Sequence, residues 1–374
     1  MSNSTDSSRR LRLRLPGLAN FSAIYLWVIF LVLFGFLQGN LYLSKDTFQL
    51  VFAQNSVTGV LALAFLMPLV TDTYDLSIGE MLSLTIVMMN YLTIHTTLPI
   101  PVIVLLLIGF GMVVGLVNGL VVVKLRVNSL IATLGMSELL QAVQLKVSNN
   151  QQVAAVFPSS FTTAGNGTVF GIPYLAIYMV VIGAIMWFVL EQTPLGRRMM
   201  AVGGNRDAAR LAGISSNRIV WGSLVTSGAV AAVAGIMYTA QVGAYTSDIG
   251  SQYLFPSLAA VFFGASQLSQ RPNVWGTLIA FFALAFGIQG LTLQFGAGTF
   301  WVNPLFQGTA LIIAVAIAST RGAVGNGRDG GGLRRMVRRR GGGAPPSPPS
   351  AADRATAAPV RVDELAHDEP LSKP

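Results

Sequence analysis

The chain has 374 residues, of which 53% are hydrophobic and only 10% are charged, with a formal net charge of +9. A soluble globular domain carries about a quarter charged residues, so this composition excludes an ordinary soluble protein. The absence of cysteine excludes disulfides and thiolate metal sites, and the two histidines leave little room for an imidazole metal cluster.

The apolar residues come in long runs, many of about twenty residues, the length that an α-helix needs to cross a bilayer. We therefore predict an all-α, polytopic transmembrane helical bundle of about ten spans. The run at 254–268 is short and is bounded by Pro256 and Gly264, which favours a half-helix or a re-entrant segment. The predicted spans are 21–38, 48–70, 76–96, 99–123, 128–147, 171–190, 218–241, 254–268, 273–294 and 303–320.

Three parts follow from this division. Residues 1–20 form a basic cytoplasmic segment, residues 21–320 form the membrane domain, and residues 321–374 are expected to be a disordered tail rich in Gly, Pro and Arg. With ten spans, all the arginine-rich connections fall on one side, and the uncharged connection 148–170 falls on the other. The positive-inside rule then places both termini in the cytoplasm. Orientation explains the positive charge better than a nucleic-acid partner does.

Small residues form bare helix faces in two spans. Gly111, Gly115 and Gly119 recur at every fourth residue, and the stretch "SGAVAAVAG" at 227–235 is similar. Such faces let helices approach closely in a membrane, where van der Waals contact drives association. We predict that they pack within the molecule.

Polar side chains inside the spans are costly in hydrocarbon and need a partner or a wet cavity. The fifth span carries a polar stripe, Ser137, Gln141, Gln144 and Ser148, with Glu138 beside it. This stripe could line a translocation path, or its residues could pair within the bundle, and the sequence favours neither. The stretch "TDTYDLSIGE" at 71–80 resembles a helix start that Asp75 can cap, although such a helix end could also meet substrate hydroxyls. The candidate path residues are Asn55, Asp75, Ser77, Glu138 and Gln141.

The stretch "TPLGRRMMAVGGNRDAARLAGIS" at 193–215 interrupts the apolar runs. Asn205 is a predicted N-cap and Gly213 a predicted C′ residue of a helix over 206–212. Seven residues are too few for a stable isolated helix in water, so its small face must dock. It could lie on the bilayer or its own bundle, or it could fit a groove on a cytosolic partner.

The order of motifs resembles the permease subunit of bacterial ABC importers of the ribose/xylose/arabinose class. The matching pieces include "DLSIGEMLSL" at 75–84, "GLVNGLVVVKLRVNSLIATLGM" at 115–136 and "TPLGRRMMAVGGNRDAARLAGI" at 193–214. Two departures from the family pattern are Asp72-Thr73-Tyr74, where Gly-Gly-Ile is usual, and Ser129, where a proline is usual.

The resemblance implies a membrane subunit for a small polar solute, most of the family's substrates being monosaccharides, and a coupling segment at 193–217 that docks on a separate ATPase. It implies a substrate-binding protein and a second permease, identical or similar, as further partners. The residues implied in ATPase coupling are Gly196, Arg197, Gly204, Asn205, Ala208, Ala209, Arg210 and Gly213.

The chain itself has no phosphate-binding loop of the Gly-x-x-x-x-Gly-Lys-Ser/Thr type, because none of its lysines follows a glycine. ATP and magnesium would therefore belong to the partner, and this chain would bind no cofactor and catalyse no reaction. The alternatives are an ion-coupled secondary transporter of a small polar solute, for which Glu138 is thin support, and a multipass membrane enzyme, which the lack of clustered catalytic residues disfavours.

Overall fold

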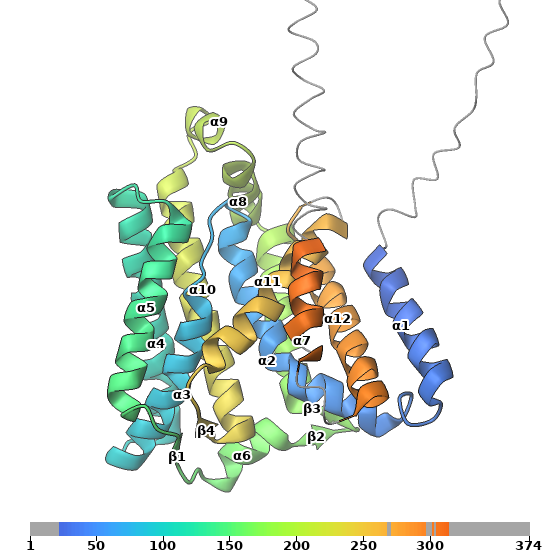
Figure 1. Ribbon diagram of the computed structural model, residues 1–374. Coiled ribbons are helices and arrows are strands. Elements are labelled where there is room, and N and C mark those ends of the chain that lie inside the picture. Colours follow the sequence, from blue (N-terminus) through green and yellow to red (C-terminus); the bar gives the residue numbers. More distant parts are fainter. Residues whose placement is uncertain (1–21, 268–270, 297–300, 303, 314–374) are drawn as a thin grey trace, which may run out of the picture. The chain divides into compact units, whose positions relative to one another are not determined.

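The computed structural model describes residues 22–267, 271–296, 301–302 and 304–313, which are mainly helical (Figure 1). The two predicted flanking parts, 1–20 and 321–374, lie outside these residues. The elements are α1 (Ser22–Gln38), α2 (Lys45–Leu69), α3 (Ile78–His95), α4 (Ile100–Gly119), η2 (Leu120–Lys124), α5 (Ser129–Ser148), β1 (Val153–Ala154), α6 (Ser159–Asn166), β2 (Thr168–Val169), β3 (Ile172–Pro173), α7 (Tyr174–Trp187), η3 (Phe188–Gln192), α8 (Pro194–Gly204), α9 (Arg206–Leu211), α10 (Ser216–Val242), β4 (Ala244–Tyr245), α11 (Ile249–Gln267) and α12 (Val274–Phe295).

A helical membrane bundle fits these elements. Among the described residues, five helices are long and apolar enough to span a bilayer: α2, α4 with η2, α7 with η3, α10 and α12. Shorter apolar helices cover 23–38, 249–265 and 304–313. The count of ten spans therefore stays a prediction, and part of the predicted span at 303–320 lies outside the described residues.

The predicted half-helix at 254–268 is wrong in its start. Helix α11 begins five residues earlier, at Ile249, and runs through Pro256 to Gln267. Proline has no N–H and therefore leaves the carbonyl of the residue four positions earlier without its helical donor. That residue is Gln252. Gly264 is likewise not a boundary but a contact point, where an added Cβ would meet the backbone of Gly276 in α12.

Helix α2 is the central element, because its residues from Ser56 to Pro68 are all buried. It packs against α7, α10, α11 and α12. Helices α4 and α10 lie in close contact through their glycines. A Cβ added to Gly111 would overlap the carbonyl oxygen of Gly228, and one added to Gly228 would overlap that of Gly111. Gly115 and Gly119 of α4 lie against Leu224 and Trp221 of α10, respectively. The predicted small faces therefore do pack within the molecule.

Between α2 and α3 the chain is not helical, although it is buried. Thr71, Thr73, Asp75 and Ser77 alternate with more exposed residues, and each of the four is at most 2% exposed. Non-helical backbone at membrane depth is tolerated only where protein supplies its hydrogen bonds. Hydroxyl groups of α5 do so: the Tyr74 N–H donates to Ser129 Oγ (3.1 Å) and the Leu76 N–H to Thr133 Oγ1 (3.1 Å).

Four short β-strands form two small sheets in the connections between the described helices. Strand β1 pairs antiparallel with β4, and β2 pairs antiparallel with β3. These strands and α6 lie at the end of the bundle opposite α8 and α9 (Figure 1). The described part of the molecule thus presents two distinct ends, one with short helices and one with strands.

Candidate functional site

The stretch at 193–215 folds as two short helices at one end of the bundle (Figure 1). Helix α8 begins at Pro194, and its N-cap Thr193 accepts a hydrogen bond from the N–H of Gly196 through Oγ1. Gly196 also lies against the carbonyl of Leu190, in a space that a Cβ would overlap. Gly196 therefore fixes the turn from η3 into α8.

Helix α9 has the caps that the sequence predicts. The Oδ1 atom of Asn205 accepts a hydrogen bond from the N–H of Ala208 (2.9 Å), and Gly213 has a φ of +79°. The helix ends at Leu211, one residue before the predicted end, and Ala212 is its C-cap. A six-residue helix is held by these caps and by its contacts, since its own backbone bonds cannot sustain it.

The small face of α9 does not act as a single docking surface. Ala209 is only 4% exposed and packs into the core, whereas Ala208 and Arg210 are exposed. Leu211 is 92% exposed and makes almost no contact with the bundle. Ala209 therefore anchors α9 to its own bundle, and Leu211 with Ala208 is left for another surface. Arg197, Gly204, Asn205 and Gly213 are also exposed.

A second candidate site is a cavity of about 1150 Å³ toward the strand-bearing end. Its described lining contains no acidic or basic side chain, and it combines amides with aromatic rings. The rings of Tyr238 and Tyr253 meet edge to face, with centroids 5.5 Å apart. We refer to this space as the amide cavity. Its polar and aromatic lining residues are Gln54, Asn55, Thr58, Tyr238, Gln241, Ser251, Gln252, Tyr253, Phe255, Phe281, Phe306 and Gln307.

Several hydrogen-bonding groups of the amide cavity are only half used. The amide nitrogen of Asn55 donates to the carbonyl of Val51 (2.9 Å), and that of Gln241 donates to the carbonyl of Ala53 (3.2 Å). These contacts orient each side chain and leave its oxygen as an acceptor. The carbonyl of Gln252, released by Pro256, is a further acceptor. Such a lining suits an uncharged solute that carries hydroxyl groups.

The structure does not bring the five predicted path residues together. Of these, only Asn55 lines the amide cavity. Asp75 and Ser77 lie in a buried cluster, where Asp75 Oδ1 accepts from the Ser77 hydroxyl (2.6 Å) and Asn118 donates to Ser77 Oγ (2.9 Å). Glu138 is exposed and Gln141 is half-buried on α5, and neither lines the cavity.

The polar stripe of α5 is mainly internal. Ser137 donates to the carbonyl of Leu76 (3.1 Å), and Gln144 bridges Glu80 and Ser83 of α3. These contacts support pairing within the bundle rather than a path. Asp75 is not the N-cap residue of α3, because the helix begins at Ile78; it instead accepts the N–H of Ser77 (3.1 Å).

Sequence reasoning missed most of the cavity lining. Gln241 and Tyr238 lie inside an apolar span, and the cost of a buried amide could have flagged Gln241. Gln252 and Tyr253 precede the predicted span at 254–268, where polar residues carry no such meaning, but they lie inside α11. No pattern in the sequence shows that α2, α10, α11 and α12 converge on one space.

Comparison with known proteins identifies the family of the chain. Residues 48–315, more than half of the chain, match the family model described as the permease component of branched-chain amino acid transport systems. The chain belongs to this permease family.

Individual relatives of the permease agree with that assignment. It is 30% identical to the ribose import permease protein of Escherichia coli K12 over 322 residues, which are 85% of this chain and 98% of the relative. It is 29% identical to the fructose import permease protein of Rhizobium meliloti, over 78% of this chain and 82% of the relative. It is 28% identical to a galactose/methyl galactoside import permease of Haemophilus influenzae, over 80% and 94%. No solved structure matches the chain.

The permease is accordingly a transport component rather than an enzyme. Its family and its apolar helices identify it as a multi-pass protein of the inner membrane. The comparisons leave the solute and the roles of single residues to be argued from the chain itself.

Proposed function

We propose that the permease is the membrane subunit of an ABC importer and carries a monosaccharide through the amide cavity. The observation that supports this most is the cavity's lining, in which amides and aromatic rings occur without a charged side chain among the described residues. A sugar presents many hydroxyl groups and apolar ring faces, but no charge. The named relatives import ribose, fructose and galactose, which is the same chemistry.

In this proposal ATP and magnesium belong to a separate ATPase, and a substrate-binding protein delivers the sugar. The ATPase contacts the permease at α8 and α9, and Leu211 is the side chain that enters the partner. A leucine that is 92% exposed gains free energy only when another surface covers it, about 2 kcal/mol for full burial.

The proposed mechanism is alternating access. When ATP binding closes the ATPase pair, α9 moves with it, and α10 carries that movement toward the amide cavity. Both termini are proposed to be cytoplasmic, on the side of α8 and α9, and the strand-bearing end faces the binding protein. A second permease, either another copy or a similar chain, completes the path.

The test is a purification of the permease with its native partners, followed by reconstitution into liposomes. We expect an ATPase and a binding protein to be retained, and ATP-dependent accumulation of a neutral labelled monosaccharide. Leu211→Asp should weaken retention of the ATPase and reduce uptake by at least about tenfold. The matched control is Leu41→Asp, which changes an exposed leucine in the connection between α1 and α2, outside α8 and α9. Uptake driven by an ion gradient without ATP would overturn the proposal.

A further inference from the structure

A second cavity, of about 800 Å³, lies between α9 and the turn that joins η2 to α5. We refer to it as the basic cavity, because four of its lining side chains are cationic: Lys124, Arg126, Arg206 and Arg210. Its neutral lining includes Thr73, Asn217 and Ser129, and Asp72 is its only acidic residue among the described lining. It is separate from the amide cavity, with which it shares no lining residue.

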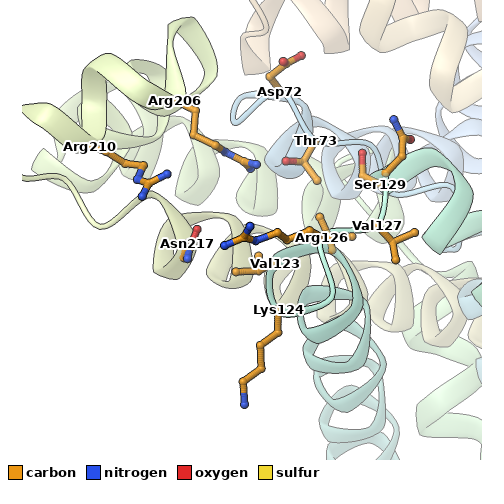
Figure 2. Close-up of a pocket in the computed structure, with 12 residues that line it drawn as sticks. Asp72, Thr73, Val123, Lys124, Arg126, Val127, Ser129, Arg206, Arg210 and Asn217 are labelled. Carbon is orange, nitrogen blue, oxygen red and sulfur yellow. The ribbon is translucent and has the colours of Figure 1, made fainter. Parts of the chain in front are cut away.

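Three arginine side chains converge in this space. Figure 2 shows the guanidinium groups of Arg126, Arg206 and Arg210 directed toward the region beside Asn217, whereas Lys124 points away. The carboxylate of Asp72 is turned away from them in the same view. Within the described part of the chain, Arg126 and Arg206 form no ion pair, and Arg210 has only Asp207 at 4.0 Å.

The three arginine side chains carry like charges toward one space although all three are exposed to solvent. Like charges that share a cavity repel one another, and the long side chains could relieve that repulsion by turning into solvent. Arg126 also has a φ of +57°, the left-handed region that non-glycine residues seldom adopt. Strained backbone at such a position is a reason to suspect a binding role.

We infer that the basic cavity binds a phosphate group. Guanidinium forks match the oxygens of phosphate and give short, charge-assisted hydrogen bonds. Arginines from two separate segments, the turn after η2 and helix α9, can hold one anion from two sides. The amide of Asn217 adds a neutral hydrogen-bonding group.

The surroundings favour a phospholipid as the source of the phosphate. Large apolar side chains next to the cavity are exposed on η2, on the turn that follows it and on α5: Leu120 is 42% exposed, Leu125 63% and Ile131 68%. These residues lie at the ends of helices α4 and α5, where a membrane protein meets lipid headgroups. Acyl chains can cover this apolar surface while the headgroup phosphate enters the basic cavity.

The test uses the full-length permease alone in lipid nanodiscs, so it does not depend on the ATPase or on transport. One set contains phosphatidylcholine only, whose choline cation neutralises its own phosphate, and a second set contains added phosphatidylglycerol, the anionic headgroup that we propose for the site. A third set is phosphatidylcholine with inorganic phosphate, with ionic strength matched by chloride. We expect phosphatidylglycerol to raise the midpoint of thermal unfolding by about 2–4 °C, as for a ligand that binds only the folded state.

The variants Arg126→Gln and Arg206→Gln should lose this shift and retain phosphatidylglycerol about tenfold less well in native mass spectrometry. Arg198→Gln, which removes an exposed arginine of α8 outside the cavity, should retain both. Because lipid retention is read on the folded protein, it remains informative if a variant is less stable.

A shift with phosphatidylglycerol supports the phosphate site with a lipid as its source. A shift with inorganic phosphate alone supports the site with a soluble source. The same midpoint in all three sets, or equal losses in Arg198→Gln and Arg126→Gln, would overturn the inference. In that case, if Arg126→Gln and Arg206→Gln change the unfolding midpoint only when the ATPase is added, the arginines would instead bind an acidic surface of that protein.

Discussion

Single residues set how closely the helices of this permease can lie. The contact between Gly111 and Gly228 is reciprocal, with each residue filling the space that the other's missing side chain leaves. The same span contains Gly109, which has no atom within 4 Å of the position of an added Cβ. Gly111 and Gly109, on the same helix, can therefore be compared directly.

We expect Gly111→Ala to destabilise the permease by about 1–3 kcal/mol, because the new methyl group would overlap backbone that cannot turn aside. Gly109→Ala should be neutral or slightly stabilising, because alanine is the better helix former. Thermal unfolding in detergent measures both. Equal midpoints for the two variants would contradict the proposed close contact of α4 and α10.

Hydroxyl groups on α5 have a similarly local role. Thr133→Val keeps the shape of the side chain but leaves the buried N–H of Leu76 without its acceptor. We expect a loss of about 1–3 kcal/mol in the free energy of unfolding. The control is Thr226→Val, whose exposed hydroxyl bonds only within its own helix. A larger effect at Thr226 would refute this account of the segment 70–77.

At the scale of elements, α9 is the part that depends most on its ends. Asn205→Ala should cost about 1 kcal/mol of local helix stability and speed hydrogen exchange at the Ala208 amide. Asn205→Asp keeps an acceptor at the N-terminus and should preserve protection. If both variants exchange like the wild type, the cap does not hold the helix.

What could be predicted from the sequence at this scale follows from the range of each interaction. The caps of α9 were predictable because Asn205 and Gly213 act within one turn of the helix. The start of α11 was not, since Pro256 reads as a boundary although neighbouring helices hold it inside one. The stripe on α5 was visible, but its partner was a backbone segment some sixty residues away, which no local pattern reveals.

At the scale of the whole molecule, the amide cavity joins residues from α2, α10, α11, α12 and the helix at 304–313. Composition and motif order were enough for the family and the helical bundle. They could not locate this space, because it exists only where these five segments meet. Of the five predicted path residues, only Asn55 reaches it.

The absence of charge in the amide cavity can be tested directly. Gln241→Glu is nearly isosteric and places a carboxylate at a half-buried position of the lining, where an ion is costly to desolvate. We expect uptake of a neutral sugar to fall by at least about tenfold, with ATPase retention unchanged. Gln151→Glu, in an exposed loop outside the cavity, is the control. Undiminished uptake by Gln241→Glu would argue against this cavity as the route.

The interlocked glycines of α4 and α10 have a mechanical consequence for the basic cavity. Arg126 follows α4 and its π-helical extension, whereas Arg206 and Arg210 precede α10. Two helices that touch backbone to backbone cannot slide independently and should travel as one rigid body. The distances between the three arginines would then stay constant through the transport cycle. An anion bound there would move together with α4 and α10 and would not be released at each turnover.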